Sequence, residues 1–234
     1  INLAASSGGI KFSQKNHASL LRNNILINLN ILEVSRKLKI KKIILTLTNG
    51  MYSEKSKQPY KENDIHNGYP PKNNYGSSFA KRFIDPAIKA YREQYKMNII
   101  GLILPNLYGP NDNFNLDDAT MLSATIHKAY LAKQEGSKLV VWGDGTPKRD
   151  YVFAEDVREI YIWALKNYSK NKLINIGSGK NLPVKKIVNC ICKNIGFNNK
   201  NIIFDKSKPK GVLNRRVSIT YFRSLYKKKF TPLE

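Results

Sequence analysis

KKIILTLT, residues 41–48, is a short apolar run that ends in a glycine turn. A similar run, NIIGLILP, occupies residues 98–105, and INLAA opens the sequence at residues 1–5. Short aliphatic runs bounded by turn residues predict buried strands. Residues 16–40 and 76–95 lie between these runs and carry apolar side chains at helical spacing. This alternation of strands and helices predicts an α/β fold with a doubly wound parallel sheet.

Turn residues and a proline divide the rest of the sequence into shorter elements. Pro86 should kink or restart the helix over 76–95, because proline removes a backbone donor within a helix. We expect loops at 49–74 and 106–115, helices at 120–136 and 182–196, a strand at 172–179, and a strand, turn, strand and helix over 138–167. The pattern predicts two interleaved parts, residues 1–115 with the doubly wound sheet and residues 116–234 with a smaller α/β domain.

Composition excludes several classes of protein. The chain has 234 residues, 41% of them hydrophobic, and no apolar run reaches the roughly 20 residues of a membrane span. The net charge of +23 favours anionic ligands, but the lysines are spread along the chain, so we expect no specific nucleic-acid function. Cys190 and Cys192 have one residue between them, a poor spacing for a disulfide or a metal site. Reduced cysteines are typical of a cytoplasmic protein.

Several segments resemble the GDP-L-fucose synthases, which belong to the extended short-chain dehydrogenase/reductase group. The most specific are NLYGPNDNFNLDD at 106–118 and VVWGDGTPKRDY at 140–151. Others are LAASSGGI (3–10), NILINLNILEVSRK (24–37), AYREQY (90–95) and IHKAYLAK (126–133). The resemblance implies a Rossmann domain that binds NADP(H), a smaller domain that binds a GDP-sugar, and a dimer formed through residues 16–37 and 76–95. The partner in that dimer is a second copy or a paralogue.

The resemblance also implies a reaction. Enzymes of this family convert GDP-4-keto-6-deoxy-mannose to GDP-L-fucose. A cysteine and a histidine epimerise two carbons beside the ketone, and a hydride from NADPH then reduces it. A Tyr-x-x-x-Lys pair and a hydroxyl residue serve the reduction. The tyrosine donates a proton to the forming alkoxide, while the lysine holds the nicotinamide ribose and lowers the tyrosine pKa.

The stretch NNYGSSFAKRFID, residues 73–85, carries the lysine of this pair but not its tyrosine. Lys81 matches the family lysine, and Ser77 stands four residues earlier, where the tyrosine belongs. Residues four apart share a helix face, whereas Tyr75 is six residues away and points elsewhere unless a frayed helix start lets it swing in. Thr48 matches the hydroxyl residue. Serine is a poor substitute for a phenol as a proton donor, because its pKa is far higher.

Three further positions depart from the family pattern. Gly50 replaces the epimerising cysteine, and Thr120 replaces the epimerising histidine. Lys210 replaces an aspartate that binds the nucleotide sugar, which reverses the charge. Losses at several positions within well-matched flanks predict a site with little or no reductase activity.

Other positions keep the family's binding residues. By resemblance, Lys128, Trp142 and Arg149 contact the GDP-sugar, and the Arg149 guanidinium suits a diphosphate. Without the resemblance, a core position for Trp142 is the more common alternative. The resemblance assigns the cofactor to Thr48, Lys81, Asn106, Leu107 and Thr120.

No strand in the sequence is followed by the G-x-G-x-x-G turn that holds the cofactor pyrophosphate. SSGGI at 6–10 and GSGK at 177–180 match other turns of the family. We therefore expect the resemblance to begin inside the Rossmann domain, without its first three strands and with INLAA as an apolar sheet edge. Three interpretations stay open: an NADP(H)-dependent epimerase/reductase of low activity, a non-catalytic homologue that binds GDP-sugar or pairs with an active paralogue, and a decayed fragment.

Overall fold

A three-stranded parallel sheet lies at the centre of the molecule, which is described by a computed structural model over residues 1–208 and 211–233. Its strands are β1 (Ile43–Thr48), β2 (Ile99–Leu104) and β7 (Ile174–Asn175), in the order β1-β2-β7. β1 and β2 pair in register along all six residues. Gly101 on β2 allows close packing, since a Cβ there would lie 2.4 Å from the Leu173 side chain.

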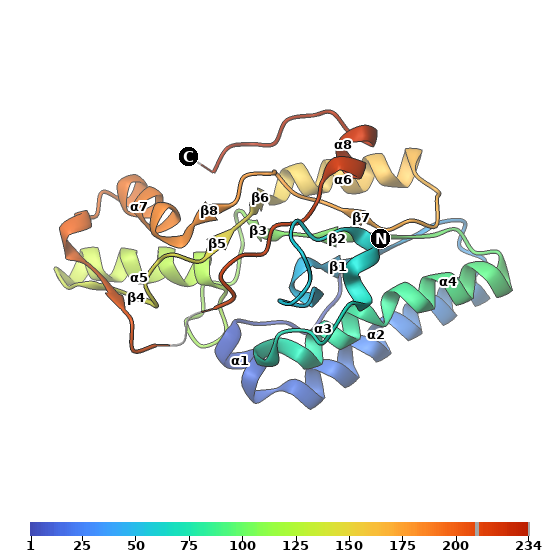
Figure 1. The fold of residues 1–234 in the computed structure, drawn as a ribbon, viewed down its shortest axis with the longest axis horizontal. Coiled ribbons are helices and arrows are strands. Elements are labelled where there is room, and N and C mark those ends of the chain that lie inside the picture. Colours follow the sequence, from blue (N-terminus) through green and yellow to red (C-terminus); the bar gives the residue numbers. More distant parts are fainter. Residues whose placement is uncertain (209–210, 234) are drawn as a thin grey trace.

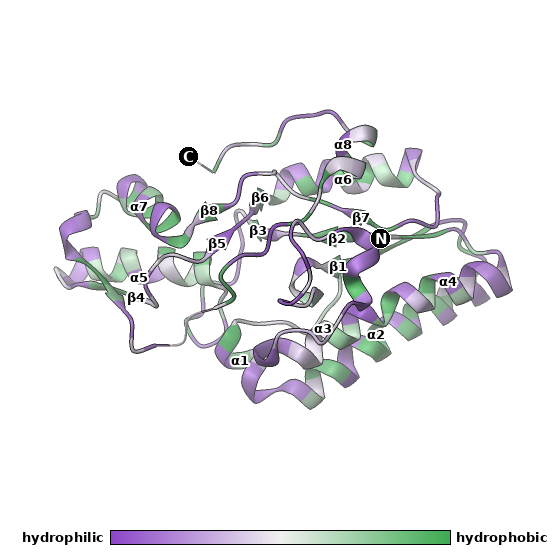
Figure 2. Ribbon diagram, in the orientation of Figure 1, coloured by the Kyte–Doolittle hydropathy of each residue, from purple (hydrophilic) through white to green (hydrophobic). Residues whose placement is uncertain are grey.

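Helices cover both faces of this sheet (Figure 1). On one face lie α2 (His17–Lys37), α3 (Tyr75–Arg82) and α4 (Ile84–Tyr95), and on the other lie α6 (Ala154–Asn167) and α8 (Thr220–Leu225). Each face has its own cluster of buried apolar side chains. Apolar residues run in stripes along α2 and α4, as expected of helices that pack on a sheet (Figure 2). The predicted doubly wound α/β fold is confirmed.

A second group of elements packs around a third apolar cluster. It contains α5 (Met121–Glu135), α7 (Val184–Ile195), β4 (Leu139–Trp142) and β9 (Ile202–Asp205). Two short pairs connect it to the central sheet. They are β3 (Asn106–Tyr108) with β6 (Tyr151–Phe153), and β5 (Lys148–Arg149) with β8 (Leu182–Pro183). The division into residues 1–115 and 116–234 stays a prediction.

Residues 1–5 do not form the buried strand that the sequence predicted. Only Asn2 bridges to β1, through its N–H and the Ile44 carbonyl at 2.9 Å, while Ile1 and Leu3 are 52% and 65% exposed. The Asn2 side chain instead donates to Asn28 on α2 at 3.1 Å. That contact turns a polar residue inward, so alternation places the apolar neighbours of Asn2 outward.

Three other elements differ from or refine the prediction. Pro86 restarts the helix as expected: α3 ends at Arg82 and α4 begins at Ile84. The predicted loop over 106–115 contains β3, because its first three residues pair with β6. A short helix, α1 (Ile10–Lys15), was not predicted, since six residues are too few to show a helical period.

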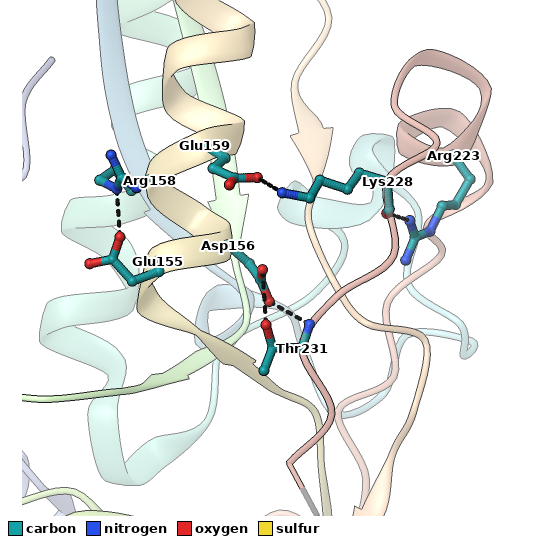
Figure 3. Close-up of polar contacts among 7 residues, drawn as sticks. All are labelled: Glu155, Asp156, Arg158, Glu159, Arg223, Lys228 and Thr231. Carbon is teal, nitrogen blue, oxygen red and sulfur yellow. Dashed lines mark hydrogen bonds and ion pairs between the residues drawn. The ribbon is translucent and has the colours of Figure 1, made fainter.

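The segment after α8 lies along α6 and is tied to it by polar contacts (Figure 3). The Asp156 carboxylate accepts hydrogen bonds from the Thr231 N–H at 2.7 Å and the Thr231 hydroxyl at 3.2 Å. Lys228 pairs with Glu159, and the Lys228 carbonyl accepts from Arg223. Within residues 1–208 and 211–233, no helix is both long and apolar enough to cross a membrane.

Candidate active site

The carboxyl end of β1 meets helix α3, and the candidate active site lies there. Open parallel sheets bind ligands at the carboxyl ends of their strands. Thr48 is the last residue of β1 and begins a tight turn, η1 (Asn49–Met51). Its hydroxyl oxygen accepts a hydrogen bond from the Gly50 N–H at 3.3 Å, which holds the turn in place.

Helix α3 is fixed against this turn by close backbone packing and two hydrogen bonds. A Cβ at Gly76 would lie 2.2 Å from the His17 carbonyl, so only glycine lets α3 approach α2 this closely. The Ser78 hydroxyl donates to the Gly50 carbonyl at 3.2 Å. The Lys81 ammonium donates to the Thr46 carbonyl at 2.9 Å. Burial lowers the pKa of Lys81 to about 8.

Ser77 lies on α3 one turn before Lys81 and is half-buried. Its hydroxyl makes no hydrogen bond to any residue that the structure describes. The Tyr75 ring stacks on His17, with 4.1 Å between ring centroids, and its centroid lies 6.4 Å from that of the tilted Tyr69 ring. Tyr75 is the first residue of α3. The phenol nearest to Ser77 in sequence is therefore held in an aromatic cluster with His17.

Gly50 is buried, and two polar side chains surround it. A Cβ at this position would lie 3.3 Å from Arg215 Nη1 and 3.4 Å from Asn74 Nδ2. Sequence reasoning did not single out either residue. Arg215 lies far along the chain from β1, and only folding brings it to the end of that strand. Burial, and then the charge of Arg149, lowers the pKa of Arg215 to about 10.

Lys128, Trp142 and Arg149 come from α5, β4 and β5. The Lys128 ammonium lies over the Trp142 ring, 5.6 Å from its centroid. The Trp142 side chain is not a core residue, since it is 46% exposed. Arg149 Nη1 donates to the carbonyls of Lys148 and Val212, both at 2.7 Å, and burial lowers the pKa of this guanidinium.

Asn106 and Leu107 lie on β3, directly after β2. The Asn106 amide donates to the Asp150 carbonyl at 3.1 Å, and Leu107 packs against the apolar cluster beneath α6. Asp150 was not predicted from the sequence, although it is buried and well connected. Its carboxylate accepts from the Ser178 hydroxyl at 2.5 Å and the Ser178 N–H at 3.0 Å. Burial outweighs these bonds and raises the pKa of Asp150 to about 6.

Thr120 lies just before α5 and is exposed, with its hydroxyl 3.1 Å from that of Ser123. Lys210 lies outside the described residues. Within the part of the chain that the structure describes, no group of His, Cys, Asp and Glu side chains is arranged to hold a metal ion.

These contacts join some of the predicted residues and leave others apart. Thr48 and Gly50 lie together at the end of β1, with Asn74 and Arg215 beside Gly50, while Lys81 bonds to the Thr46 carbonyl two residues earlier on the strand. Burial, and then the positive charge of Arg149, lowers the pKa of Arg215 beside this group. Lys128 and Trp142 form a separate pair, and Thr120 contacts neither group.

Comparison with known proteins places this arrangement in a family. The model of the NAD dependent epimerase/dehydratase family matches residues 1–177. A GDP-L-fucose synthase from Dictyostelium discoideum is 32% identical over all of this chain and 74% of the relative. One from Sinorhizobium fredii is 33% identical over 93% of this chain and 69% of the relative.

A solved structure supports the same assignment. A GDP-L-fucose synthetase from Naegleria fowleri bound to NADP superimposes with a TM-score of 0.90 at 28% identity, covering 98% of this chain and 71% of the other. The chain belongs to the NAD dependent epimerase/dehydratase family and, within it, to the GDP-L-fucose synthases.

Proposed function

We propose that this chain binds NADP(H) and a GDP-sugar as an epimerase/reductase of the GDP-L-fucose synthase kind, and that its catalytic rate is very low. Homology to GDP-L-fucose synthases supports the reaction class and both ligands. We infer the low rate from Ser77, which lies one helical turn from Lys81 at the position where the family has its proton-donating tyrosine. Tyr75, the phenol nearest to Ser77 in sequence, does not take that place, because its ring stacks on His17.

The reduction needs a proton for the alkoxide that forms at the ketone carbon. A serine hydroxyl is several pKa units less acidic than a phenol, so it transfers a proton poorly at neutral pH. A positioned general acid contributes about 10²- to 10⁴-fold in rate. Thr48 retains a hydroxyl that would hold the substrate oxygen, which supports orientation of the substrate without replacing the lost acid.

The epimerisation steps lack their acid and base as well. Gly50 has no side chain, and the Thr120 hydroxyl does not ionise near neutral pH. Thr120 is also exposed and bonded to Ser123. We therefore expect no proton exchange at the two carbons beside the ketone.

Lys81 and its surroundings fit the nicotinamide half of NADP(H). The buried ammonium donates one hydrogen bond to the Thr46 carbonyl, so two of its three N–H donors are left for ribose hydroxyls. Thr48, Asn106 and Leu107 would complete this part of the site. NADPH, when bound, supplies the hydride for the reduction.

The GDP-sugar would extend from the end of β1 toward α5 and β4. The Arg149 guanidinium, anchored on two carbonyls, would face the diphosphate, and Lys128 with the exposed Trp142 would contact the nucleoside. These roles are part of the proposal. If binding is retained while catalysis is absent, the chain is a non-catalytic homologue that binds GDP-sugar.

We also propose that the chain pairs with a second copy or a paralogue in the cytoplasm, through the helices of residues 16–37 and 76–95, which are α2, α3 and α4. Exposed apolar side chains on this face support the proposal: Leu26 and Val34 on α2 are 48% and 53% exposed, and Tyr95 on α4 is 40% exposed. Sedimentation at micromolar concentration would distinguish a dimer from a monomer.

The test uses the purified chain and two measurements. Calorimetry with GDP is expected to give saturable binding, which Arg149→Gln weakens. NADPH oxidation with GDP-4-keto-6-deoxy-mannose is expected to be slower than ordinary enzyme rates by at least about 10²-fold. GDP-fucose formed at ordinary rates would refute the low-activity proposal, and no heat at millimolar GDP would refute the binding proposal.

A further inference from the structure

Asp150 is a buried carboxylate to which the proposed function gives no role. It lies between β5 and β6 and is 6% exposed. Its two oxygens accept hydrogen bonds from the turn that follows β7. Oδ1 accepts from the Ser178 hydroxyl at 2.5 Å, and Oδ2 accepts from the Ser178 N–H at 3.0 Å and the Gly179 N–H at 3.4 Å. Hydrogen bonds to a charged acceptor are strong, so this contact fixes the turn and Asp150 to each other.

The turn reaches Asp150 because residue 177 is glycine. Gly177 is buried, and a Cβ atom there would lie 2.8 Å from Asp150 Oδ2 and 3.0 Å from the Ile219 side chain. A side chain at this position would therefore push the turn away from the carboxylate. Glycine allows a backbone to approach another group this closely.

The main chain of Asp150 is attached to β3 as well. Its carbonyl accepts from the Asn106 amide at 3.1 Å, and the next residue, Tyr151, pairs with Asn106 across β6 and β3. Asp150 is thus held by β3 through its main chain and by the turn after β7 through its side chain. Both partners belong to segments that directly follow strands of the central sheet.

Arg149, the residue before Asp150, lacks such an attachment through its own side chain. Its guanidinium donates to the carbonyls of Lys148 and Val212, and neither residue lies on a strand of the central sheet. These two bonds orient the guanidinium relative to β5. The position of β5 relative to the central sheet depends on other contacts, and the side chain of Asp150 makes the most direct of them.

We infer that Asp150 is a positioning residue, which ties β5 to the turn after β7 and so holds the Arg149 guanidinium where it meets the diphosphate of a GDP-sugar. In Asp150→Asn an amide NH₂ group would replace one carboxylate oxygen and face N–H donors of the turn, so the tie would be lost. β5 would then move relative to the central sheet and carry Arg149 with it. The inference rests on the proposed function, because it takes the contact between Arg149 and the diphosphate as given.

A double-mutant cycle with GDP-mannose tests this inference by calorimetry. The measurements are made at pH 8, where the carboxylate is ionised, since burial raises the pKa of Asp150 only to about 6. Arg149→Gln and Asp150→Asn should each weaken binding by about tenfold, as the loss of a hydrogen bond to a charged group predicts. The double variant should bind no more weakly than Arg149→Gln alone, because Asp150 acts through Arg149. A role in stability alone would not produce this dependence on Arg149.

Ser178→Ala keeps the test decisive if Asp150→Asn does not fold. It removes only the hydroxyl bond to Asp150, so it should weaken GDP-mannose binding by a smaller factor, and this loss should disappear when Arg149→Gln is also present. Glu93→Gln is the control for the removal of a negative charge. Glu93 is exposed on α4 and bonds to no described residue, so this variant should keep the affinity of the unmodified chain.

The possible outcomes separate the inference from the proposed function. Unchanged affinity in folded Asp150→Asn, or in Ser178→Ala where the first variant does not fold, overturns the inference, while binding by the unmodified chain upholds the proposed function. Losses that add in the double variant also overturn it, because Asp150 then does not act through Arg149. Absence of binding by the unmodified chain, or unchanged affinity in Arg149→Gln, refutes the proposed diphosphate contact and the inference with it.

Discussion

Replacing Ser77 with tyrosine should restore a proton donor to the site. Ser77 and Lys81 lie one turn apart on α3, so their Cβ atoms are about 5–6 Å apart and their side chains share a face. Ser77 is half-buried and its hydroxyl bonds to no described residue, so the substitution breaks no hydrogen bond. The Lys81 ammonium, with two donors left over, would lie beside the new phenol and lower its pKa.

The magnitude follows from the role of the phenol. A general acid contributes about 10²- to 10⁴-fold, which lowers the barrier by about 3–5 kcal/mol. The assay is NADPH oxidation with a GDP-4-keto-hexose that needs no epimerisation, because Gly50 and Thr120 leave those steps without acid and base. Ser77→Tyr should exceed the unmodified chain by at least about 10²-fold.

Two controls isolate the hydroxyl from the ring. Ser77→Phe adds the same ring without the hydroxyl and should leave the rate at the level of the unmodified chain. The double substitution Ser77→Tyr with Lys81→Met should lose the gain, because Lys81 no longer lowers the phenol pKa. A rate for Ser77→Phe equal to that of Ser77→Tyr would refute the reasoning, as would a well-folded Ser77→Tyr that binds both ligands without a gain.

Three further predictions concern pH and stability. The pKa of Lys81 is lowered to about 8 in the folded state, so the folded chain loses this proton at a lower pH than the unfolded chain does. Between pH 8 and 10.5, the unfolding free energy measured in urea should therefore rise by about 3 kcal/mol for the unmodified chain relative to Lys81→Met. The pKa of Asp150 is raised from 3.8 to about 6 in the folded state, so its stabilising effect is present at low pH and is lost as the pH rises through 6. Relative to Asp150→Asn, the unmodified chain should lose about 3 kcal/mol of unfolding free energy between pH 4 and 7 in the same experiment. A difference between the two proteins that stays constant with pH would contradict this prediction. Asp156→Ala should release the segment around Thr231 and cost about 1 kcal/mol of unfolding free energy. Hydrogen exchange at the Thr231 amide should become faster. Unchanged exchange would show that other contacts hold the segment.

Much of the fold could be predicted because its signals are local. Apolar runs of strand length marked β1 and β2, and Pro86 marked the restart of the helix. Gly136 marked the end of α5, where it adopts a left-handed conformation with φ of +65°. These signals depend on residues that are close together in the sequence, so they can be recognised in a single sequence.

The parts that could not be predicted depend on partners far away in the chain. Asn2 faces inward because Asn28 lies across from it, and that pairing overrides the apolar pattern of residues 1–5. The candidate site shows the same limit. The family resemblance predicts roles for Lys81 and Ser77, but Arg215 reaches Gly50 from 165 positions along the chain, and nothing in its local sequence indicates that contact.

We propose that this site has lost its acid and base groups and has kept its ligand-binding groups. Proton exchange in D₂O tests the claim without depending on hydride transfer. The chain is incubated with NADP⁺ and GDP-4-keto-6-deoxy-mannose, and deuterium at the two carbons beside the ketone is followed by NMR. We expect incorporation no faster than in the protein-free control, together with calorimetric binding of GDP by the same preparation. Rapid incorporation at either carbon would contradict the account, because it would require a working acid–base group where Gly50 and Thr120 stand.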